Sequence, residues 1–255
     1  MTSTHDKLLE AHFFGVETYG KLDVTTPFDV VIEPLDEQKY PEMNKCFIKL
    51  FYDSEAEDNL DCLTLDSIKN LYEFKVNKKD RKAITIEAKY KTSVEVPVLC
   101  KIQAPLKFDL HVIGESKNVQ ISKMECSTIS VDLDDNKSDS ETGQKKTSSC
   151  TLNSIKVIKC DRVQAQTVSM TTELGNISAT SVYVPQSSFS SDYGDIDLNN
   201  CHSNCTVKIN QGNLKIGSFE GNLDADLHTG SVDIYMTRPK EVKVTTQSGK
   251  PDHQK

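Results

Sequence analysis

Three glycines near the C-terminal end of the chain lie nine residues apart, at Gly212, Gly221 and Gly230. The same nine-residue unit recurs upstream as far as Gly175, and one copy is a residue longer. Nine residues are too few for a pair of antiparallel helices, but they accommodate one short strand and one turn. The spacing therefore predicts a fold that is built from stacked strands and turns.

Each unit follows one template, in which a first position that is usually Gly precedes Asn, Asp or Ser, and the third and fifth positions are apolar. Side chains of a strand alternate between two faces, so we expect the third and fifth positions inside and the polar fourth position outside. The Gly allows the backbone of a corner, and the polar residue after it can bond the turn or its copy one coil away. The predicted core residues are Ile196, Leu198, Leu214, Ile216, Val232 and Ile234.

Two such units would close a coil of about eighteen residues, and successive coils would stack as parallel strands. The sequence thus predicts an all-β protein, a parallel β-solenoid over residues 105–247 that is preceded by an N-terminal β-rich capping region, residues 1–104. Calcium-binding β-rolls need a doubled glycine and an aspartate at the sixth position, which these units lack apart from Asp226. Structural calcium is therefore not expected.

The N-terminal region contains no repeat, but it has short alternating or apolar runs that are typical of strands. We expect strands at residues 22–24, 30–33, 46–51, 71–76 and 84–88. The segment "HDKLLEAHF" is expected to form a short helix, and "NKKDRK" at 77–82 a charged hairpin turn.

Residues 132–149, "DLDDNKSDSETGQKKTSS", have almost no apolar side chains and are expected to form a mobile surface insertion. Ser138 and Ser140 lie among acidic residues there, so they are candidate sites for phosphorylation by an acidophilic kinase. A tolerated insertion without such a role is the favoured interpretation. Residues 248–255 are expected to form a disordered tail.

The chain of 255 residues carries a net charge of -8 and has no cluster of Lys and Arg, which argues against binding to nucleic acid. No apolar run approaches the length of a membrane span, and the N-terminus resembles neither a secretory nor a transit signal. We therefore expect an intracellular protein, most simply cytoplasmic, or mitochondrial if the N-terminus is incomplete. The eight cysteines are scattered, so free thiols are expected.

Paired aspartates are the candidates for catalysis, namely Asp195 with Asp197 and Asp224 with Asp226. Glycan hydrolases and lyases with β-helical folds use such pairs, in which one acid protonates the leaving group and the other activates water. The fourth positions of alternate units, however, place Asp197, Lys215 and Asp233 in one outward row, which favours ion pairing between coils. We predict no catalytic residue, and we treat Asp197, Lys215 and Asp233 as a candidate binding face.

The segment "CHSNC", Cys201 to Cys205, offers two sulfurs and an imidazole to a metal ion. A closed tetrahedral zinc site usually brings a second pair of ligands, and the template turns Cys205 into the core. His111, His202 and His228 have no partner that the spacing identifies. The sequence therefore predicts no metal site and no cofactor.

Several segments carry a resemblance to a known family: "QAPLKFDLHV", "SSFSSDYGDIDL", "GNLKI", "GSVDIYM" and the upstream "VVIEPLDEQKYPE". They resemble the animal proteins called family with sequence similarity 185 member A, which belong to a putative-adhesin group of unknown function. The resemblance covers most of the chain in order and spacing, and residues 132–149 look inserted. It implies no catalytic residues.

We expect a non-enzymatic β-solenoid scaffold or protein-binding module that presents a regular sheet face to a protein partner. The alternative is a glycan hydrolase or lyase that uses the paired aspartates. The repeat pattern continues through Val242 and Val244 toward the C-terminal end, so the last coil is expected to be poorly covered. Its open edge predicts self-association by strand addition.

Overall fold

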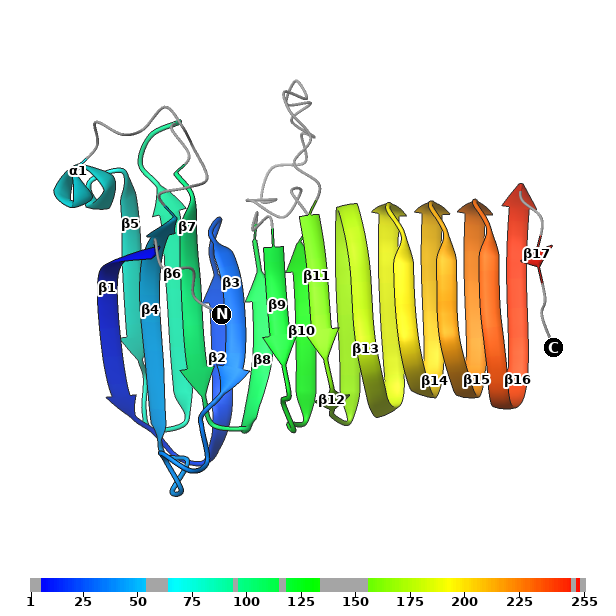
Figure 1. The fold of residues 1–255 in the computed structure, drawn as a ribbon, viewed down its shortest axis with the longest axis horizontal. Coiled ribbons are helices and arrows are strands. Elements are labelled where there is room, and N and C mark those ends of the chain that lie inside the picture. Colours follow the sequence, from blue (N-terminus) through cyan, green and yellow to red (C-terminus); the bar gives the residue numbers. More distant parts are fainter. Residues whose placement is uncertain are drawn as a thin grey trace.

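A computed structural model describes residues 6–53, 64–93, 96–114, 118–133, 156–248 and 251–252. Within these ranges the regular structure is almost entirely β, with a single 17-stranded mixed sheet and one short helix, α1 (Leu65–Lys69). The sheet winds into a solenoid-like shape, with β1 (Asp6–Gly15) near one end and β16 (Val232–Ser248) at the other (Figure 1). The prediction of an all-β protein is confirmed.

Long parallel strands form the C-terminal half of this sheet, and each one bends around the corners of a coil (Figure 1). Paired residues of β14 and β15 are eighteen positions apart, as for Ile196 beside Leu214, whereas the spacing between β15 and β16 changes from eighteen to nineteen after Gly221. The six predicted core side chains are all buried, so that prediction is confirmed. Besides β16, the strands are β13 (Thr167–Tyr193), β14 (Ile196–Gln211) and β15 (Leu214–Thr229), and β17 (Pro251–Asp252) pairs with the start of β16.

Glycine is required at one corner of these coils. Gly194, Gly212 and Gly230 stack there with φ values of 156°, 155° and 147°. A Cβ atom on any of them would meet the carbonyl oxygen of the glycine one coil earlier, which for Gly194 is Gly175. Side chains rarely tolerate this backbone conformation, and here they would also meet backbone, so the corner accepts only glycine.

A ladder of polar side chains runs beside the glycine corner. The backbone N–H of Asp195 donates to Asn176 Oδ1 at 2.8 Å, and that of Asn213 donates to Asp195 Oδ1 at 2.8 Å. The backbone N–H of Ser231 donates to Asn213 Oδ1 at 3.1 Å. The expectation that this residue bonds its copy one coil away is therefore confirmed.

The N-terminal region does not stand apart from the stack, because β2 and β3 form a coil within it. β2 is parallel to both β6 and β8, and β3 is parallel to both β7 and β9. Parallel pairs therefore cross the boundary expected between residues 104 and 105. The bounds are β2 (Tyr19–Thr25), β3 (Asp29–Pro34), β6 (Ala83–Tyr90), β7 (Val98–Ala104), β8 (Lys107–Ile113) and β9 (Asn118–Ser122).

Antiparallel pairs occupy the N-terminal end of the stack, where β1 pairs with β4 (Lys45–Asp53), β4 with β7, and β5 (Tyr72–Lys78) with β6. The five expected strands of this region are present. The short helix expected in "HDKLLEAHF" is wrong, because residues 6–15 pair along β4 and bury Leu9. The expected hairpin turn is confirmed, and Asp80 Oδ1 accepts from the backbone N–H groups of Lys82 and Ala83.

Three further strands connect the two halves: β10 (Thr128–Leu133), β11 (Lys156–Asp161) and β12 (Val163–Gln164). Asp132 and Leu133 belong to β10, where pairing with β13 and burial of Leu133 hold them, so the insertion expected at 132–149 does not begin there. The rest of that segment, with Ser138 and Ser140, lies outside the described residues. Within the expected C-terminal tail, Ser248 ends β16, and residues 251–252 pair with the start of β16 as β17.

Candidate functional site

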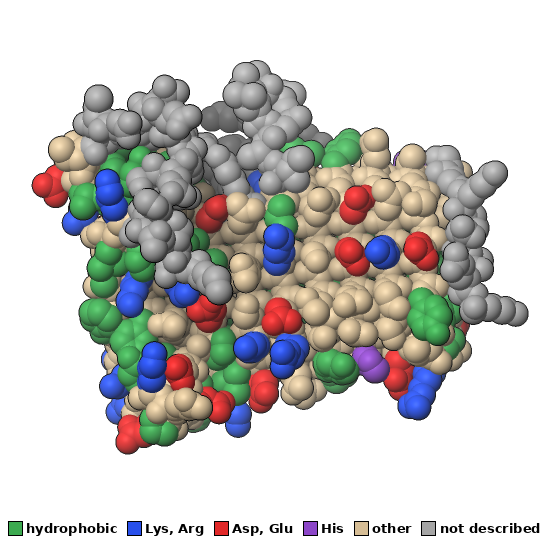
Figure 2. Space-filling view, in the orientation of Figure 1, with side chains coloured by type: hydrophobic (Ala, Val, Ile, Leu, Met, Phe, Trp, Pro, Cys, Tyr) green, Lys and Arg blue, Asp and Glu red, His purple; other side chains and the backbone are tan. Residues whose placement is uncertain are grey.

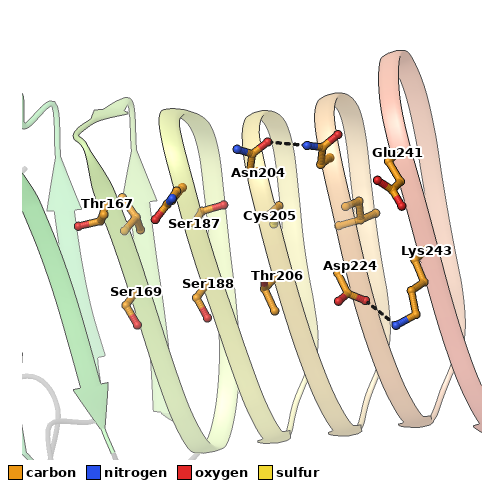
Figure 3. A pocket seen from close by; sticks show the side chains of 14 residues that line it. Thr167, Ser169, Ser187, Ser188, Asn204, Cys205, Thr206, Asp224, Glu241 and Lys243 are labelled. Atoms are coloured by element: carbon orange, nitrogen blue, oxygen red, sulfur yellow. Dashed lines mark hydrogen bonds and ion pairs between the residues drawn. The ribbon is translucent and has the colours of Figure 1, made fainter.

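A groove of about 590 Å³ crosses successive coils of the C-terminal half (Figure 3). Its walls come from equivalent positions of β13, β14, β15 and β16, because the parallel register brings residues of each coil beside their copies. One row of outward side chains along it consists of Ser169, Ser188, Thr206, Asp224 and Lys243. The groove is therefore a consequence of the repeat.

Neutral polar groups dominate the lining of this groove. Asn222 Nδ2 donates to Asn204 Oδ1 at 3.0 Å, and Lys243 Nζ lies 3.7 Å from Asp224 Oδ1 (Figure 3). Hydroxyl and amide groups supply both donors and acceptors, whereas the exposed Asp224–Lys243 pair balances its own charge. None of the described lining residues is aromatic. The groove is thus suited to hydrogen bonding along a polar, extended ligand.

A buried cluster of two hydroxyls and two thiols lies at the floor of the groove. Ser187 Oγ is 2.6 Å from Ser203 Oγ, and Cys201 Sγ is 3.4 Å from Ser203 Oγ. Interaction with Cys205 lowers the pKa of the Cys201 thiol, whereas interaction with Cys201, together with burial, raises the pKa of Cys205. Ser187 and Cys205 line the groove, so the cluster lies directly beneath it.

The cysteines are free thiols wherever the structure describes them, as the sequence predicted. Cys205 points into the core, also as predicted. The imidazole of "CHSNC" turns outward, away from the sulfurs, because His202 Nδ1 lies 3.1 Å from Glu220 Oε2. Cys62 and Cys150 lie outside the described residues.

His202 has partners that the sequence analysis missed. Tyr183 stacks on its ring with centroids 4.7 Å apart, and Glu220 and Arg238 follow in register on the next two coils. His111 Nδ1 likewise lies 3.2 Å from Asp23 Oδ1, across β8 and β2. The spacing of eighteen residues from His202 to Glu220 could have revealed the first pair. No feature of the sequence near His111 could have revealed its pairing with Asp23.

The candidate binding face of Asp197, Lys215 and Asp233 has the expected geometry. The three residues pair in register across β14, β15 and β16 and are exposed. Figure 2 shows alternating acidic and basic side chains in a row over these coils. In the part of the chain that the structure describes, however, no ion pair joins them, so the expected pairing between coils is not formed at contact distance.

The paired aspartates occupy different environments. Asp195 Oδ1 accepts hydrogen bonds from the backbone N–H and Nδ2 of Asn213, at 2.8 and 3.0 Å, so this oxygen helps to hold a corner of the stack. Asp197 and Asp226 are exposed, and Asp224 lies beside Lys243. The predicted pairs therefore do not share one enclosed site.

Two kinds of feature are missing from the described residues. No group of three or more His, Cys, Asp or Glu side chains there is placed to hold a metal ion. No described helix has the length and apolar character that crossing a membrane requires.

Comparison with known proteins identifies one family and several solved structures. A model of the Toastrack DUF4097 family matches residues 64–254. A putative adhesin from Bacteroides fragilis NCTC 9343 has a TM-score of 0.51 and 13% identity, and the match covers 94% of this chain and 95% of that one. A putative adhesin from Parabacteroides merdae ATCC 43184 has a TM-score of 0.45 and 12% identity, with 97% of each chain covered.

A putative lipid binding protein from Parabacteroides distasonis ATCC 8503 is also similar, with a TM-score of 0.40, 8% identity and 96% of each chain covered. At such low identity, similarity to the Bacteroides fragilis protein indicates a shared fold alone.

Proposed function

The chain belongs to the Toastrack DUF4097 family, and on this premise we propose that it is a non-enzymatic protein-binding module. A protein that shares its fold is described as a putative adhesin, which agrees with a role in binding. The closer affiliation with family with sequence similarity 185 member A stays a prediction from the quoted sequence segments.

We further propose that the repetitive region is a parallel β-solenoid in which two nine-residue units make each coil. The parallel register of eighteen between β14 and β15 supports this description, as do the glycines at Gly212, Gly221 and Gly230. Such a stack repeats the same outward positions at the spacing of strands, about 4.8 Å. It can therefore offer one kind of contact several times along a bound chain.

The groove is the observation that carries the proposal. The row of five side chains from Ser169 to Lys243 spans about 19 Å at the spacing of neighbouring strands. An extended polypeptide covers about 3.3 Å per residue, so the groove matches a segment of about six residues. The mostly uncharged lining favours a polar segment that hydrogen-bonds the hydroxyl and amide groups.

The lining disfavours the glycan alternative, because sugar rings commonly stack on aromatic side chains and the described walls contain none. Asp195 Oδ1 already accepts a hydrogen bond from the backbone N–H of Asn213, which also disfavours its use in glycan cleavage.

Proximity labelling in cells, with a matched pair of variants, tests the proposal. Thr206→Arg fills the groove, whereas Thr180→Arg places the same side chain at an exposed site outside its lining. We expect the proteins enriched by the wild type to fall at least about tenfold with T206R and to persist with T180R. Equal enrichment by both variants would reject the groove as the binding site.

A third variant, Lys215→Glu, examines the candidate binding face of Asp197, Lys215 and Asp233. Loss of the same partners with K215E and their retention with T206R would move the site to that face. Turnover of any glycan by the purified chain would contradict the non-enzymatic role.

We also propose that the chain acts without a metal or a cofactor and within the cell. Elemental analysis of the purified protein tests the absence of a metal, since stoichiometric zinc or calcium would contradict it. Fluorescence microscopy of the full chain tests its location within the cell.

A further inference from the structure

The stack has an open strand edge at each of its two ends. At the C-terminal end, β17 covers only Val232 and Asp233 of β16, so residues 241–248 have no described strand on their outer side. At the N-terminal end, β5 pairs with β6 alone among the described strands. Such edges present backbone N–H and C=O groups to any strand that can add to them.

Both edges also leave apolar core side chains incompletely covered. Val242 and Val244 of β16 are partly buried against the core, and so are Phe74 and Val76 of β5. A strand that added to either edge would bury these side chains further. Each end of the stack therefore offers an apolar contact beside its open backbone groups.

The directions of the two edges suit an antiparallel ladder between two copies of the chain. The strands on this side of the stack run parallel to one another from β6 to β16, whereas β5 runs antiparallel to β6. The two edges lie at opposite ends of the molecule (Figure 1). A second copy that stacks on the first in the same orientation would bring its β5 antiparallel to residues 241–248.

The outward charges of the two edges select one register for this ladder. Where Glu241 lies opposite Lys75, Lys243 lies opposite Glu73, so both pairs are attractive. A slip of two residues keeps the same side chains inward, but it opposes Lys243 to Lys75 in one direction. In the other direction the slip opposes Glu241 to Glu73. Like charges directly opposite each other destabilise a sheet, so only the first register is favourable.

Neighbouring charges continue the alternation on both sides of this junction. Lys243 Nζ lies 3.7 Å from Asp224 Oδ1 near one edge, and Lys89 Nζ lies 3.0 Å from Glu73 Oε2 near the other. The outward row across the junction would consist of Asp224, Lys243, Glu73 and Lys89. The charges of the two ends are therefore complementary over four strands.

We propose that the chain assembles head to tail, with residues 241–248 of one copy antiparallel to β5 of the next and Glu241 opposite Lys75. In this register Val242 lies beside Phe74, so the apolar core continues from one copy into the other. The contact joins two different surfaces, so each added copy leaves a free end for another. The assembly does not depend on the proposed binding role.

Sedimentation equilibrium of the full chain over a range of concentrations tests the open assembly. At about 0.1 mM and above, we expect the weight-average mass to rise past that of two copies without a plateau. A plateau at two copies would indicate a closed contact between identical surfaces and would overturn the proposal. A strictly monomeric chain at these concentrations would overturn it as well.

Charge reversals test the register. Lys75→Glu and Glu241→Lys change exposed side chains, and each places like charges across the junction. Each variant alone should associate about fivefold more weakly than the wild type, because a repulsive exposed pair replaces an attractive one. An equimolar mixture should associate at least as tightly as the wild type, since the two reversed ends match each other and the two unchanged ends still match. No recovery in the mixture would contradict the register.

The matched control is Lys159→Glu, which reverses the same charge at an exposed position of β11, away from both ends of the stack. This variant should associate like the wild type. A loss equal to that of Lys75→Glu would attribute the effect to net charge and would contradict the assigned contact. Circular dichroism confirms that each variant is folded.

Zero-length cross-linking with a carbodiimide locates the contact. This reagent joins an amine to a carboxylate that touches it, so the associated wild type should yield the links Lys75–Glu241 and Lys243–Glu73. Because β5 and β16 lie at opposite ends of one molecule, these links can form only between copies (Figure 1). Peptide mass spectrometry that finds neither link in the associated protein would overturn the proposal.

Discussion

The same corner contact occurs in both halves of the molecule, at very different distances along the chain. In the C-terminal half, Asn213 bonds Asp195 and Ser231, each eighteen residues away. In the N-terminal half, Asp29 accepts from the backbone N–H and Nδ2 of Asn118, eighty-nine residues away, at 3.0 and 2.8 Å. The local geometry is shared, but only one half repeats it in sequence.

This difference arises from the order in which the coils stack. From β14 to β16, each coil lies on the one that precedes it in the chain. In the N-terminal half, the coil of β2 and β3 lies between that of β6 and β7 and that of β8 and β9 (Figure 1). A regular sequence repeat thus marks sequential stacking, whereas an inserted coil is held by pairs from distant segments.

Deletions of different length should have the largest effect on the C-terminal half. Removal of residues 212–229 joins Gln211 to Gly230 and keeps the register of eighteen, so a cooperative thermal transition should remain. Removal of residues 212–220 moves every downstream unit to the opposite sheet of the stack, where it no longer lies beside its equivalent on the preceding coil. Because each core side chain that is misplaced in this way costs about 1.5–3 kcal/mol, the shorter deletion should abolish cooperative unfolding.

Differential scanning calorimetry compares the two deletions. Equal loss of stability from both would contradict the role of the eighteen-residue register. The same experiment has no counterpart in the N-terminal half, where removal of β2 and β3 would deprive each of the strands β6 to β9 of one parallel partner.

A glycine in each half provides the next contrast. Gly230→Ala places a Cβ against the carbonyl oxygen of Gly212 at a φ of 147°, so we expect a loss of about 3 kcal/mol. Gly15→Ala, at the end of β1, meets no atom within 4 Å and should change stability by less than about 1 kcal/mol. Chemical denaturation measures both, and similar losses would mean that the glycine corner is not a constraint.

The shared corner contact should be worth a similar amount in both halves. Asn213→Ala removes the acceptor for Ser231, and Asp29→Ala removes the acceptor for Asn118. We expect each substitution to lower the free energy of unfolding by about 1–2 kcal/mol. An effect confined to Asn213 would show that the N-terminal coils are held in another way.

The smallest expected effect concerns the last coil. Val242 and Val244 are only partly buried, whereas Leu223 and Ala225 at the same positions one coil earlier are buried. Among the described residues, β16 pairs on its outer side only at Val232 and Asp233, with β17. The remaining edge is therefore open to strand addition.

Analytical ultracentrifugation tests self-association through this edge. We expect the wild type to associate at about 0.1 mM and a variant with Val242→Lys and Val244→Pro to stay monomeric, because the lysine and proline block strand addition. A strictly monomeric wild type at that concentration would reject the prediction.

The sequence predicted the C-terminal core because its pattern is periodic. Ile196, Leu214 and Val232 recur every eighteen residues, so burial and register follow from alternation alone. In the N-terminal half the strands were recognisable, but their partners were not, since Leu22 pairs with both Ile84 and Leu110. The helix expected near Leu9 was wrong for the same reason, because pairing with β4 outweighs local preference.

The candidate site was less predictable than the fold. The outward row of Asp197, Lys215 and Asp233 follows from the repeat, and the structure places it as expected. The groove runs along equivalent positions of the repeat, but the sequence analysis did not recognise that these positions form a groove. The hydroxyl of Ser187 is buried beneath it, where the template predicts an apolar side chain, so this part of the site was not predicted.

Hydrogen–deuterium exchange of β2 and β3 tests the inserted coil most directly. Both strands are flanked by parallel partners on each side, whereas β1 pairs only with β4 in the described sheet. The amides of Leu22, Val24 and Ile32 should therefore exchange as slowly as those of β8 and at least about 100-fold more slowly than those of β1. Exchange of β2 and β3 as fast as β1 would contradict their place inside the stack.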